Sequence, residues 1–250
     1  MAAKVLVIVG TRPEVIKMAP VITALKQWSE DISTRLVLTG QHEALAEDMA
    51  KLYNLEVDYR LHQMRPNDSL PQLVARMMVE IADLLSEDRP DLVLVHGDTA
   101  TTFTGALAAF YARIPVGHVE AGLRTYDLDN PFPEEANRSL VARLATLHFA
   151  PTEAARAALL HEGVPSQNIA VTGNTVIDSV LLAQSQIDAG AEVTLPKLSG
   201  KRMMLVTVHR RESWGEGIAH ICHGVRLSWK PFPMLKSCCR CILARLCMTA

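Results

Sequence analysis

Short runs of apolar residues alternate with longer amphipathic stretches along most of the chain. The first apolar run covers residues 5–9 and stops at Gly10, and an amphipathic stretch at residues 13–27 follows it. The same alternation returns at residues 34–39 and 43–52. Strands that alternate with helices in this way are typical of βαβ units, whose strands lie parallel in one sheet.

The alternation continues through the middle of the chain. Residues 69–85 have apolar positions near a 3.6-residue spacing, which predicts a helix, and residues 91–95 predict the strand that follows. A helix rich in small residues at 101–112 then leads to a strand at 114–119. Residues 92–95 are apolar throughout, as expected of a strand buried on both faces. We therefore expect an α/β fold with a Rossmann-like, doubly wound parallel sheet.

The pattern divides the chain into four parts. We expect a first domain at residues 1–187, a linker at 188–200 that is rich in Ala, Gly, Pro and Ser, and the start of a second domain at 201–224. A fresh apolar strand at 203–208 opens that second domain. Too few residues follow for a complete second α/β domain, so we expect it to be incomplete.

The last part, residues 225–250, differs from the rest in charge and composition. Residues 221–250 contain five basic and no acidic side chains, and all five cysteines of the chain lie there. Three of them, at 238, 239 and 241, lack the paired Cys-x-x-Cys spacing and the histidines of a zinc site. We read this part as an aberrant basic, cysteine-rich tail and expect no metal.

Composition narrows the class of protein further. The chain is 49% hydrophobic and 21% charged with a net charge of −2, which is ordinary for a globular protein and gives no electrostatic reason to expect nucleic acid as a partner. We find no apolar run near the roughly 20 residues that a membrane span needs and no secretory signal. We therefore expect no membrane partner and a cytoplasmic location.

The first polar motif follows the first strand. Gly10 ends that strand, Pro13 stands near the start of the next helix, and Arg12 and Lys17 flank the turn. Free backbone amides at a helix start, with two cations beside them, suit a phosphate or diphosphate group. An ordinary strand-to-helix turn with solvated charges explains the same residues equally well.

Two acidic residues follow neighbouring predicted strands. Asp98 comes soon after the strand at 91–95, and Glu120 ends the strand at 114–119. Open α/β sheets bind ligands at the edge where the carboxyl ends of such strands meet. Two carboxylates in one partly desolvated crevice have their pKa values pushed upward and apart, as acid and base partners require. Capping of the following helix is the alternative role for Asp98.

A proline-rich loop at residues 131–133 opens the next predicted helix. Glu134 and Glu135 stand in the first turn of that helix, with Arg138 one turn later. The loop suits a segment that closes over a ligand. Stabilisation by the helix dipole is the structural alternative for the two glutamates.

A basic turn follows the first strand of the second domain. His209 and Arg210 come directly after the strand at 203–208. A histidine beside two arginines, Arg210 and Arg211, suits a phosphate group held across a cleft from the first domain. A solvated basic turn is the alternative.

Six short motifs stand in order along the chain. They are Gly10-Thr11-Arg12-Pro13-Glu14 with Lys17, Val95-His96-Gly97-Asp98-Thr99, Gly117-His118-Val119-Glu120-Ala121-Gly122-Leu123-Arg124-Thr125, Pro133-Glu134-Glu135-Ala136-Asn137-Arg138, Thr172-Gly173-Asn174-Thr175-Val176-Ile177-Asp178 and His209-Arg210-Arg211-Glu212-Ser213. Together they resemble the non-hydrolysing UDP-N-acetylglucosamine 2-epimerases. The resemblance covers about residues 3–223.

That resemblance implies a glycosyltransferase-B-like fold, in which two Rossmann-type domains hold the sugar nucleotide between them, usually in a homodimer. It implies interconversion of UDP-N-acetylglucosamine and UDP-N-acetylmannosamine for surface polysaccharide synthesis, with no cofactor. In the family mechanism the C2 proton is removed and UDP is expelled to leave a 2-acetamidoglucal. UDP then returns, and a proton reaches the opposite face of C2.

Residue roles carry over motif by motif. The expected catalytic residues are Asp98, Glu120, Glu134 and His209. The expected substrate-binding residues are Arg12, Lys17, Arg138 and Arg210. Three of the catalytic group are carboxylates for acid and base work, and His209 is expected to assist the departure of UDP.

Beyond about residue 223 the chain departs from the family, which continues with most of a second domain. A frame-shifted or prematurely ended reading frame explains such a tail, so we expect little or no epimerase activity from this chain alone. Exposed strand edges and apolar faces should also make it prone to aggregate.

Three other functions remain open. One is a hydrolysing epimerase that releases free N-acetylmannosamine, and another is a non-catalytic remnant that binds sugar nucleotides. The third, a glycosyltransferase, shares the fold but gives no reason for carboxylates at both Asp98 and Glu120.

Overall fold

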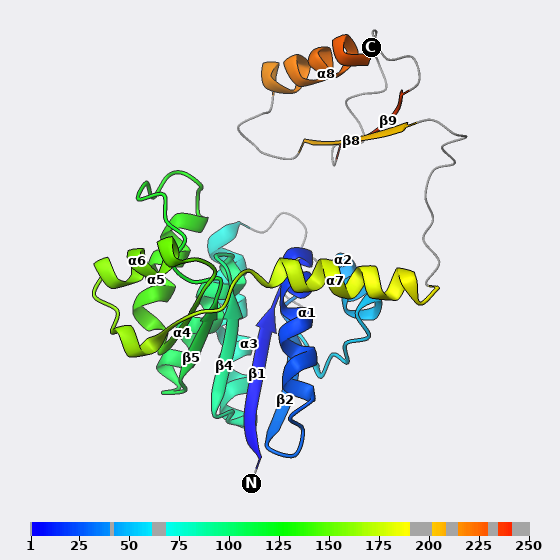
Figure 1. Cartoon of the computed structure of the whole chain (residues 1–250). Coiled ribbons are helices and arrows are strands. Elements are labelled where there is room, and N and C mark those ends of the chain that lie inside the picture. Colours follow the sequence, from blue (N-terminus) through cyan, green and yellow to red (C-terminus); the bar gives the residue numbers. More distant parts are fainter. Residues whose placement is uncertain are drawn as a thin grey trace. The chain divides into compact units, whose positions relative to one another are not determined.

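A computed structural model of the chain describes residues 2–40, 43–61, 69–190, 202–208, 215–229 and 235–241. The chain divides into two compact units, Met1–Ala191 and Glu192–Ala250. Figure 1 shows the sheet and helices of the first unit in blue to yellow.

The first unit is built on a seven-stranded sheet with the strand order β3-β2-β1-β4-β5-β6-β7. Every neighbouring pair in it is parallel. The order reverses between β1 and β4, as in a doubly wound fold, so the predicted fold class is confirmed for this unit. The strands are β1 (Ala3–Val9), β2 (Ile32–Leu38), β3 (Tyr59–Arg60), β4 (Leu92–His96), β5 (Val116–Val119), β6 (Leu147–Ala150) and β7 (Ile169–Val171).

Helices connect the strands and cover the sheet. They are α1 (Arg12–Lys26), α2 (Glu43–Leu52), α3 (Leu70–Asp88), α4 (Ala100–Tyr111), α5 (Glu134–Leu144), α6 (Glu153–His161) and α7 (Thr175–Asp188), with a short 3-10 helix η1 (Ser166–Asn168) before β7. The helices at 43–52, 69–85 and 101–112 and the strands at 91–95 and 114–119 are confirmed to within about three residues at each end.

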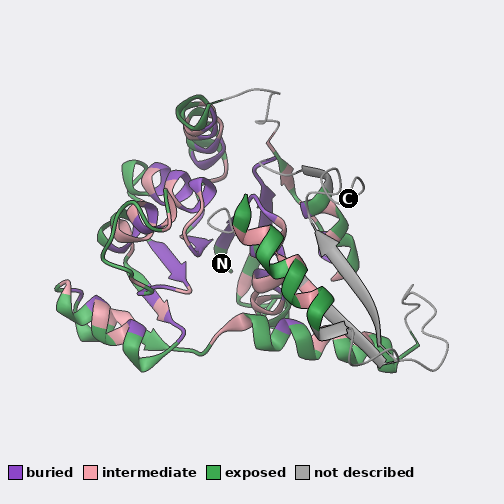
Figure 2. Ribbon diagram, turned by 90° about the horizontal axis from the view of Figure 1, so that it is seen from above, coloured by how far each residue is buried: buried purple, intermediate pink, exposed green. Residues whose placement is uncertain are grey.

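The core lies on both faces of the central strands. Side chains of β1 alternate between two clusters, with Leu6 and Ile8 packed against α3 and α4 and with Val7 and Val9 packed against α1 and α2. Figure 2 shows the resulting buried strands and the exposed outer faces of the helices. Because both faces of these strands are covered, an unbroken apolar run is the sequence that the position requires.

Helix α7 returns from the edge of the sheet to its centre. It follows β7, the last strand in the order, yet it packs against α1 near the middle. The hydroxyl of Ser179 donates to the backbone carbonyl of Ile16 at 2.6 Å and fixes this contact. In Figure 1 the yellow helix lies beside the blue α1.

The second unit contains one βαβ element in its described part. Strand β8 (Arg202–Val208) leads to α8 (Glu216–Trp229), and β9 (Leu235–Cys241) pairs with β8 in parallel. The proposed tail at 225–250 therefore includes the end of α8 and all of β9. Of the proposed linker at 188–200, the described part is the end of α7 and two residues after it.

Candidate functional site

The candidate site lies at the carboxyl edge of β1, β4 and β5. Gly97 follows β4 and Glu120 follows β5, and both have positive φ angles, 71° and 64°. Glycine adopts this left-handed conformation freely, whereas a residue with a Cβ atom pays about 1–2 kcal/mol for it. The backbone at Glu120 is therefore strained at the point where the sequence predicts a catalytic carboxylate.

Glu120 forms an ion pair with Lys17 in the second turn of α1. The ammonium Nζ of Lys17 donates to Oε1 of Glu120 at 2.8 Å and to Oε2 at 2.6 Å. The two side chains are only 23% and 12% exposed, so water screens the pair weakly. Lys17, which the sequence assigned to a diphosphate, is thus bound to the carboxylate of Glu120 in this structure.

Asp98 forms the second carboxylate–cation pair of the site. Its carboxylate accepts a hydrogen bond from Arg138 of α5, and its backbone carbonyl accepts one from Nδ2 of Asn137 at 2.8 Å. Burial raises the pKa of Asp98; Arg138 works against that rise, and the charges of Glu134 and Glu120 add to it. The upward shift expected for neighbouring carboxylates is therefore present at Asp98.

Threonines, not Asp98, cap the helix that follows β4. The hydroxyl of Thr99 accepts from the backbone amide of Thr102 at 3.2 Å, which makes Thr99 the N-cap of α4. Because that position is filled, the capping alternative for Asp98 is wrong. The hydroxyl of Thr99 also donates to Oε1 of Glu14 at 2.8 Å, and the hydroxyl of Thr102 lies 3.2 Å from the same oxygen.

Glu14 is a site residue to which the sequence analysis gave no role. Its Oε2 accepts from the backbone amides of Gly10 at 3.0 Å and Thr11 at 2.7 Å, and the residue is 2% exposed. These two amides are therefore not free for a phosphate, because they satisfy the buried carboxylate of Glu14. Burial raises the pKa of Glu14, and the hydroxyl and amide donors oppose the rise. The capping-box spacing from Thr11 to Glu14 was the available signal.

The two glutamates in the first turn of α5 have different partners. Glu135 is 1% exposed and accepts from the backbone amides of Thr125 at 3.0 Å and Tyr126 at 3.1 Å, which ties down the loop before α5. Glu134 is half-buried, and its charge acts on Asp98. Glu134 therefore belongs with the site carboxylates, whereas Glu135 holds the loop.

Three further residues were predicted to belong to the site: Arg12, His209 and Arg210. Arg12 is the first residue of α1, at the same sheet edge, and has no hydrogen-bond or ion-pair partner within the described part of the chain. His209 and Arg210 lie outside the described residues. The structure brings together five of the predicted residues, namely Lys17, Asp98, Glu120, Glu134 and Arg138.

Three buried histidines lie on neighbouring strands beneath this edge: His96 on β4, His118 on β5 and His148 on β6. Burial lowers the pKa of His96 and of His118 to about 3, and it lowers the pKa of His148 as well. All three are therefore neutral near pH 7. Nε2 of His118 lies 2.7 Å from the carbonyl oxygen of Gly97, and because a carbonyl only accepts, this nitrogen carries the proton.

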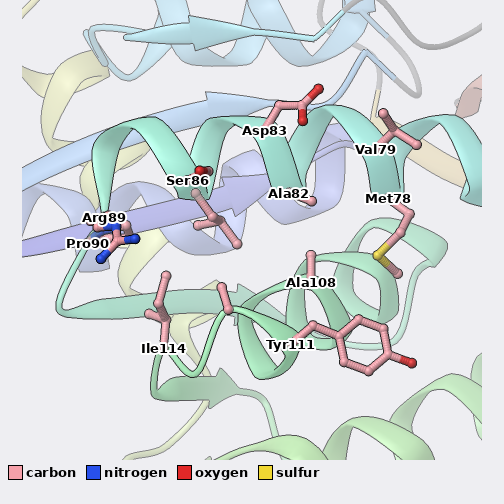
Figure 3. Close-up of a pocket in the computed structure, with 12 residues that line it drawn as sticks. Met78, Val79, Ala82, Asp83, Ser86, Arg89, Pro90, Ala108, Tyr111 and Ile114 are labelled. Atoms are coloured by element: carbon pink, nitrogen blue, oxygen red, sulfur yellow. The ribbon is translucent and has the colours of Figure 1, made fainter.

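Elsewhere, a groove of about 730 Å³ lies between α3 and α4 (Figure 3). Arg89 and Pro90 on its wall precede β4, and Ile114 precedes β5, so the groove lies near the end of the sheet opposite the carboxylates. Its charged lining residues are Asp83 and Arg89. The groove offers no paired carboxylates and is not the candidate site.

The described residues include neither a cluster of metal ligands nor a helix suited to a membrane. No three or more His, Cys, Asp or Glu side chains among them cluster as ligands for a metal ion. No helix in that part of the chain combines the length and the apolar character needed to cross a bilayer.

The chain resembles known proteins over most of its length. Residues 24–234 match the model of the family described as UDP-N-acetylglucosamine 2-epimerase. The protein of that name from Salmonella typhimurium is 47% identical over 229 residues, which cover 89% of this chain and 61% of the relative. The Escherichia coli K12 protein of the same name is 46% identical over 229 residues. The chain thus spans about three fifths of the length of these curated relatives.

Solved structures agree with this assignment. The UDP-GlcNAc 2-epimerase from Neisseria meningitidis bound to UDP-GlcNAc superposes with a TM-score of 0.88 at 42% identity, over 96% of this chain and 66% of that one. The Methanocaldococcus jannaschii enzyme in complex with UDP-GlcNAc and UDP gives a TM-score of 0.79 at 32% identity, over 95% of this chain and 66% of that one. With the sheet, the carboxylate edge and these matches in agreement, the chain belongs to the UDP-N-acetylglucosamine 2-epimerase family.

Proposed function

We propose that the carboxylate edge binds UDP-N-acetylglucosamine and inverts its C2 centre, which exchanges it with UDP-N-acetylmannosamine. The observation that carries this proposal is the gathering of Asp98, Glu120 and Glu134 at one sheet edge, with two of them paired to cations from α1 and α5. Inversion at C2 requires one group that removes a proton from one face and another that delivers a proton to the opposite face.

The proposed reaction has two halves. One carboxylate takes the C2 proton, the C–H electron pair forms a C1–C2 double bond, and the C1–O bond breaks so that UDP leaves with its electrons. In the second half a UDP phosphate oxygen adds to C1, and C2 takes a proton on its other face. The raised pKa of Asp98 suits a carboxyl group that holds a proton and gives it up again.

We assign the cations of the site to the leaving diphosphate. Lys17 and Arg138 already lie against the carboxylates, and Arg12 lies at the first position of α1 without a partner of its own in the described part of the chain. Cations held in a partly desolvated site stabilise the developing charge of a departing phosphate strongly. His209 and Arg210 are proposed to assist this departure from the second unit.

The relatives support the same substrate. Their names are those of UDP-N-acetylglucosamine 2-epimerases, and solved relatives hold UDP-GlcNAc or UDP. By resemblance, the part of the family that this chain does not cover supplies the uridine pocket and further diphosphate contacts. We therefore propose that the full reaction belongs to a protein of the relatives' length and that this chain alone turns over little substrate.

The test is to incubate the chain with UDP-N-acetylglucosamine in deuterated water and to follow deuterium at C2 and UDP-N-acetylmannosamine by NMR. The same chain extended by the remaining part of a relative is run in parallel. We expect exchange in the extended protein and little in this chain. Absence of exchange in both proteins would overturn the proposed function, and full activity of this chain alone would overturn the proposed need for the missing part.

Substitutions assign the exchange to the carboxylates. In the extended protein, Asp98→Asn, Glu120→Gln and Glu134→Gln should each lower the exchange rate by about 10²–10⁴-fold, because proton transfer by a positioned group contributes that much. Glu153→Gln is the matched control, since Glu153 is an exposed glutamate in the first turn of α6. If the control variant loses as much of the exchange rate as the site variants do, the three carboxylates are not responsible for the exchange.

Product and assembly complete the proposal. Release of free N-acetylmannosamine instead of its UDP derivative would indicate a hydrolysing enzyme. By resemblance we propose a homodimer, to be measured by sedimentation of the extended protein. A cytoplasmic location and a role in surface polysaccharide synthesis belong to the same proposal and are tested by cell fractionation and by the polysaccharide of a deletion strain.

A further inference from the structure

His96 is a buried side chain whose partner is missing from the hydrogen-bond network of the described residues. The residue is 3% exposed, yet neither Nδ1 nor Nε2 has a hydrogen-bond partner there. Its neighbour His118 by contrast donates to the carbonyl of Gly97. A buried polar group without a partner is unfavourable, so its retention points to a partner in another state of the site.

The carboxylate of Glu120 is a hydrogen-bond acceptor close to His96. Nε2 of His96 lies 3.8 Å from Oε2 of Glu120, which exceeds a hydrogen bond by about 1 Å. The same Oε2 accepts from Nζ of Lys17 at 2.6 Å. The carboxylate thus lies between an ammonium group that holds it now and a neutral imidazole just out of reach.

The surroundings of the carboxylate favour a change of partner. Lys17 is the cation paired with it, and a bound diphosphate would attract this ammonium group strongly, because the diphosphate carries more negative charge than one carboxylate. Asp98, which is paired with Arg138, is close enough to Glu120 for the two carboxylates to repel each other. His118 stands beside His96 but is already committed to Gly97.

We propose that the Lys17–Glu120 ion pair is a latch which a diphosphate ligand opens, after which Glu120 takes a hydrogen bond from His96. The inference rests on the proposed function only in taking the ligand to be a nucleoside diphosphate. While the latch is closed, the ammonium group of Lys17 occupies both oxygens of the Glu120 carboxylate. Once Lys17 turns to the diphosphate, the carboxylate is released from the ammonium, and the hydrogen bond from His96 keeps it in its orientation. His96 is a positioning residue in this scheme and does not touch the substrate.

The latch can be opened without ligand by Lys17→Met in the full 250-residue chain labelled with ¹³C and ¹⁵N. The readout is the midpoint pH at which the ¹³Cδ resonance of Glu120 titrates, with that resonance identified by its loss in Glu120→Gln. We expect the midpoint to move up, since a removed counterion no longer stabilises the anion. Lys26→Met, in the exposed last turn of the same helix, is the matched control and should leave the midpoint in place.

Variants of His96 in the Lys17→Met background test its part. His96→Phe removes the donor and should move the Glu120 midpoint up further, while His96→Gln supplies an amide donor and should restore most of it. The ¹⁵N spectrum of His96 should also show a hydrogen-bonded Nε2–H in Lys17→Met that is absent from the parent chain. If His96 had only a structural role, its substitutions would leave the Glu120 midpoint unchanged, and the hydrogen-bonded Nε2–H signal would not appear. An unchanged midpoint in Lys17→Met, or equal midpoints in all three His96 backgrounds, would overturn the proposal.

UDP at millimolar concentration separates this inference from the proposed function. Binding is read from the ³¹P resonances of UDP, in this chain and in the extended protein. If UDP binds and the Glu120 midpoint stays where it is, the latch is wrong while the binding site stands. If UDP binds to neither protein, the proposed function fails, and the Lys17→Met arm still decides whether Lys17 and His96 compete for Glu120.

Discussion

At the scale of single residues, partners decide what each carboxylate of this site can do. Glu120 is paired with the ammonium group of Lys17, and Asp98 is paired with the guanidinium of Arg138. Under the proposed function, both cations can move to the diphosphate of the ligand. Glu14 is surrounded by backbone amides and threonine hydroxyls, which offer hydrogen bonds but no charge. The first two are therefore suited to chemistry, whereas Glu14 joins the loop after β1 to the start of α4.

Glu14→Gln tests that joining role. A glutamine can accept hydrogen bonds through its carbonyl oxygen, but its NH₂ group faces donors and leaves buried N–H or O–H groups unpaired. We expect the free energy of unfolding to fall by about 1.5–3 kcal/mol, the range for hydrogen bonds to a charged group. Urea unfolding measures it, with exposed Glu153→Gln as the control. A loss no larger than that of the control would mean that Glu14 does not fix the loop.

The backbone at Gly10 lies close to the side chains of Thr39 and Thr101. A Cβ atom on Gly10 would lie 2.1 Å from Oγ1 of Thr101 and 2.4 Å from Oγ1 of Thr39, and these hydroxyls are hydrogen-bonded to each other at 2.9 Å. We expect Gly10→Ala to cost about 1–3 kcal/mol of unfolding free energy by overpacking. Repeating it in a Thr39→Ala, Thr101→Ala background removes both oxygens and should make the cost smaller. An equal cost in both backgrounds would place the strain elsewhere.

Some residues of the site were predictable from sequence and others were not, for a physical reason. Asp98 and Glu120 stand directly after apolar strands, and parallel strands bring such positions to one edge. The role of Glu14 depends on partners far along the chain, such as Thr99, which is 85 residues away. A local pattern carries no record of such contacts.

At the scale of elements, length decided which parts of the fold could be predicted. Strands β1 and β4 contain unbroken apolar runs, whereas β3 has only two residues and β7 has three. Runs that short give no readable periodicity, so the sequence analysis did not single them out. In the structure these short strands nevertheless pair in parallel with their neighbours, β3 with β2 and β7 with β6.

The ends of β4 and β5 also carry a testable pH response. Burial lowers the pKa of His96 and of His118 to about 3, below the value of about 6.5 expected in the unfolded chain. The unfolded chain therefore binds protons that the folded chain does not. The resulting stability is full above about pH 6.5 and is lost as the pH falls toward 3, with about 1.4 kcal/mol per pH unit for each histidine.

We expect His118→Gln to reduce the dependence of the unfolding free energy on pH by the contribution of one histidine, about 1.4 kcal/mol per pH unit. Urea unfolding at several pH values between about 4 and 7 gives the slope, and comparison with the parent chain cancels the contribution of the carboxylates. Exposed His161→Gln at the end of α6 is the matched control and should keep the parental slope. A parental slope in His118→Gln would show that His118 does not hold a lowered pKa in the fold.

At the scale of the whole molecule, the first unit holds all three hydrophobic clusters of the described residues. Helix α7 closes that unit by packing on α1, yet much of its surface stays apolar and exposed. Ile177, Val180 and Leu181 are 62%, 63% and 62% exposed. These three residues, which we call the α7 patch, form a continuous apolar surface within two turns of one helix, and such surfaces favour self-association.

The sequence predicts that the chain is prone to aggregate, and we expect the α7 patch to be the surface through which copies associate. We expect the triple variant Ile177→Gln, Val180→Gln, Leu181→Gln to remain monomeric at concentrations where the parent chain associates, as measured by sedimentation velocity. Leu45→Gln, Leu140→Gln, Leu160→Gln is the matched control, because these residues are exposed but scattered over α2, α5 and α6. If the scattered variant disperses the chain as well as the α7 variant does, total apolar exposure drives association. If neither does, the edge strands β3 and β7 become the source to examine, since unpaired strand edges associate through their backbone.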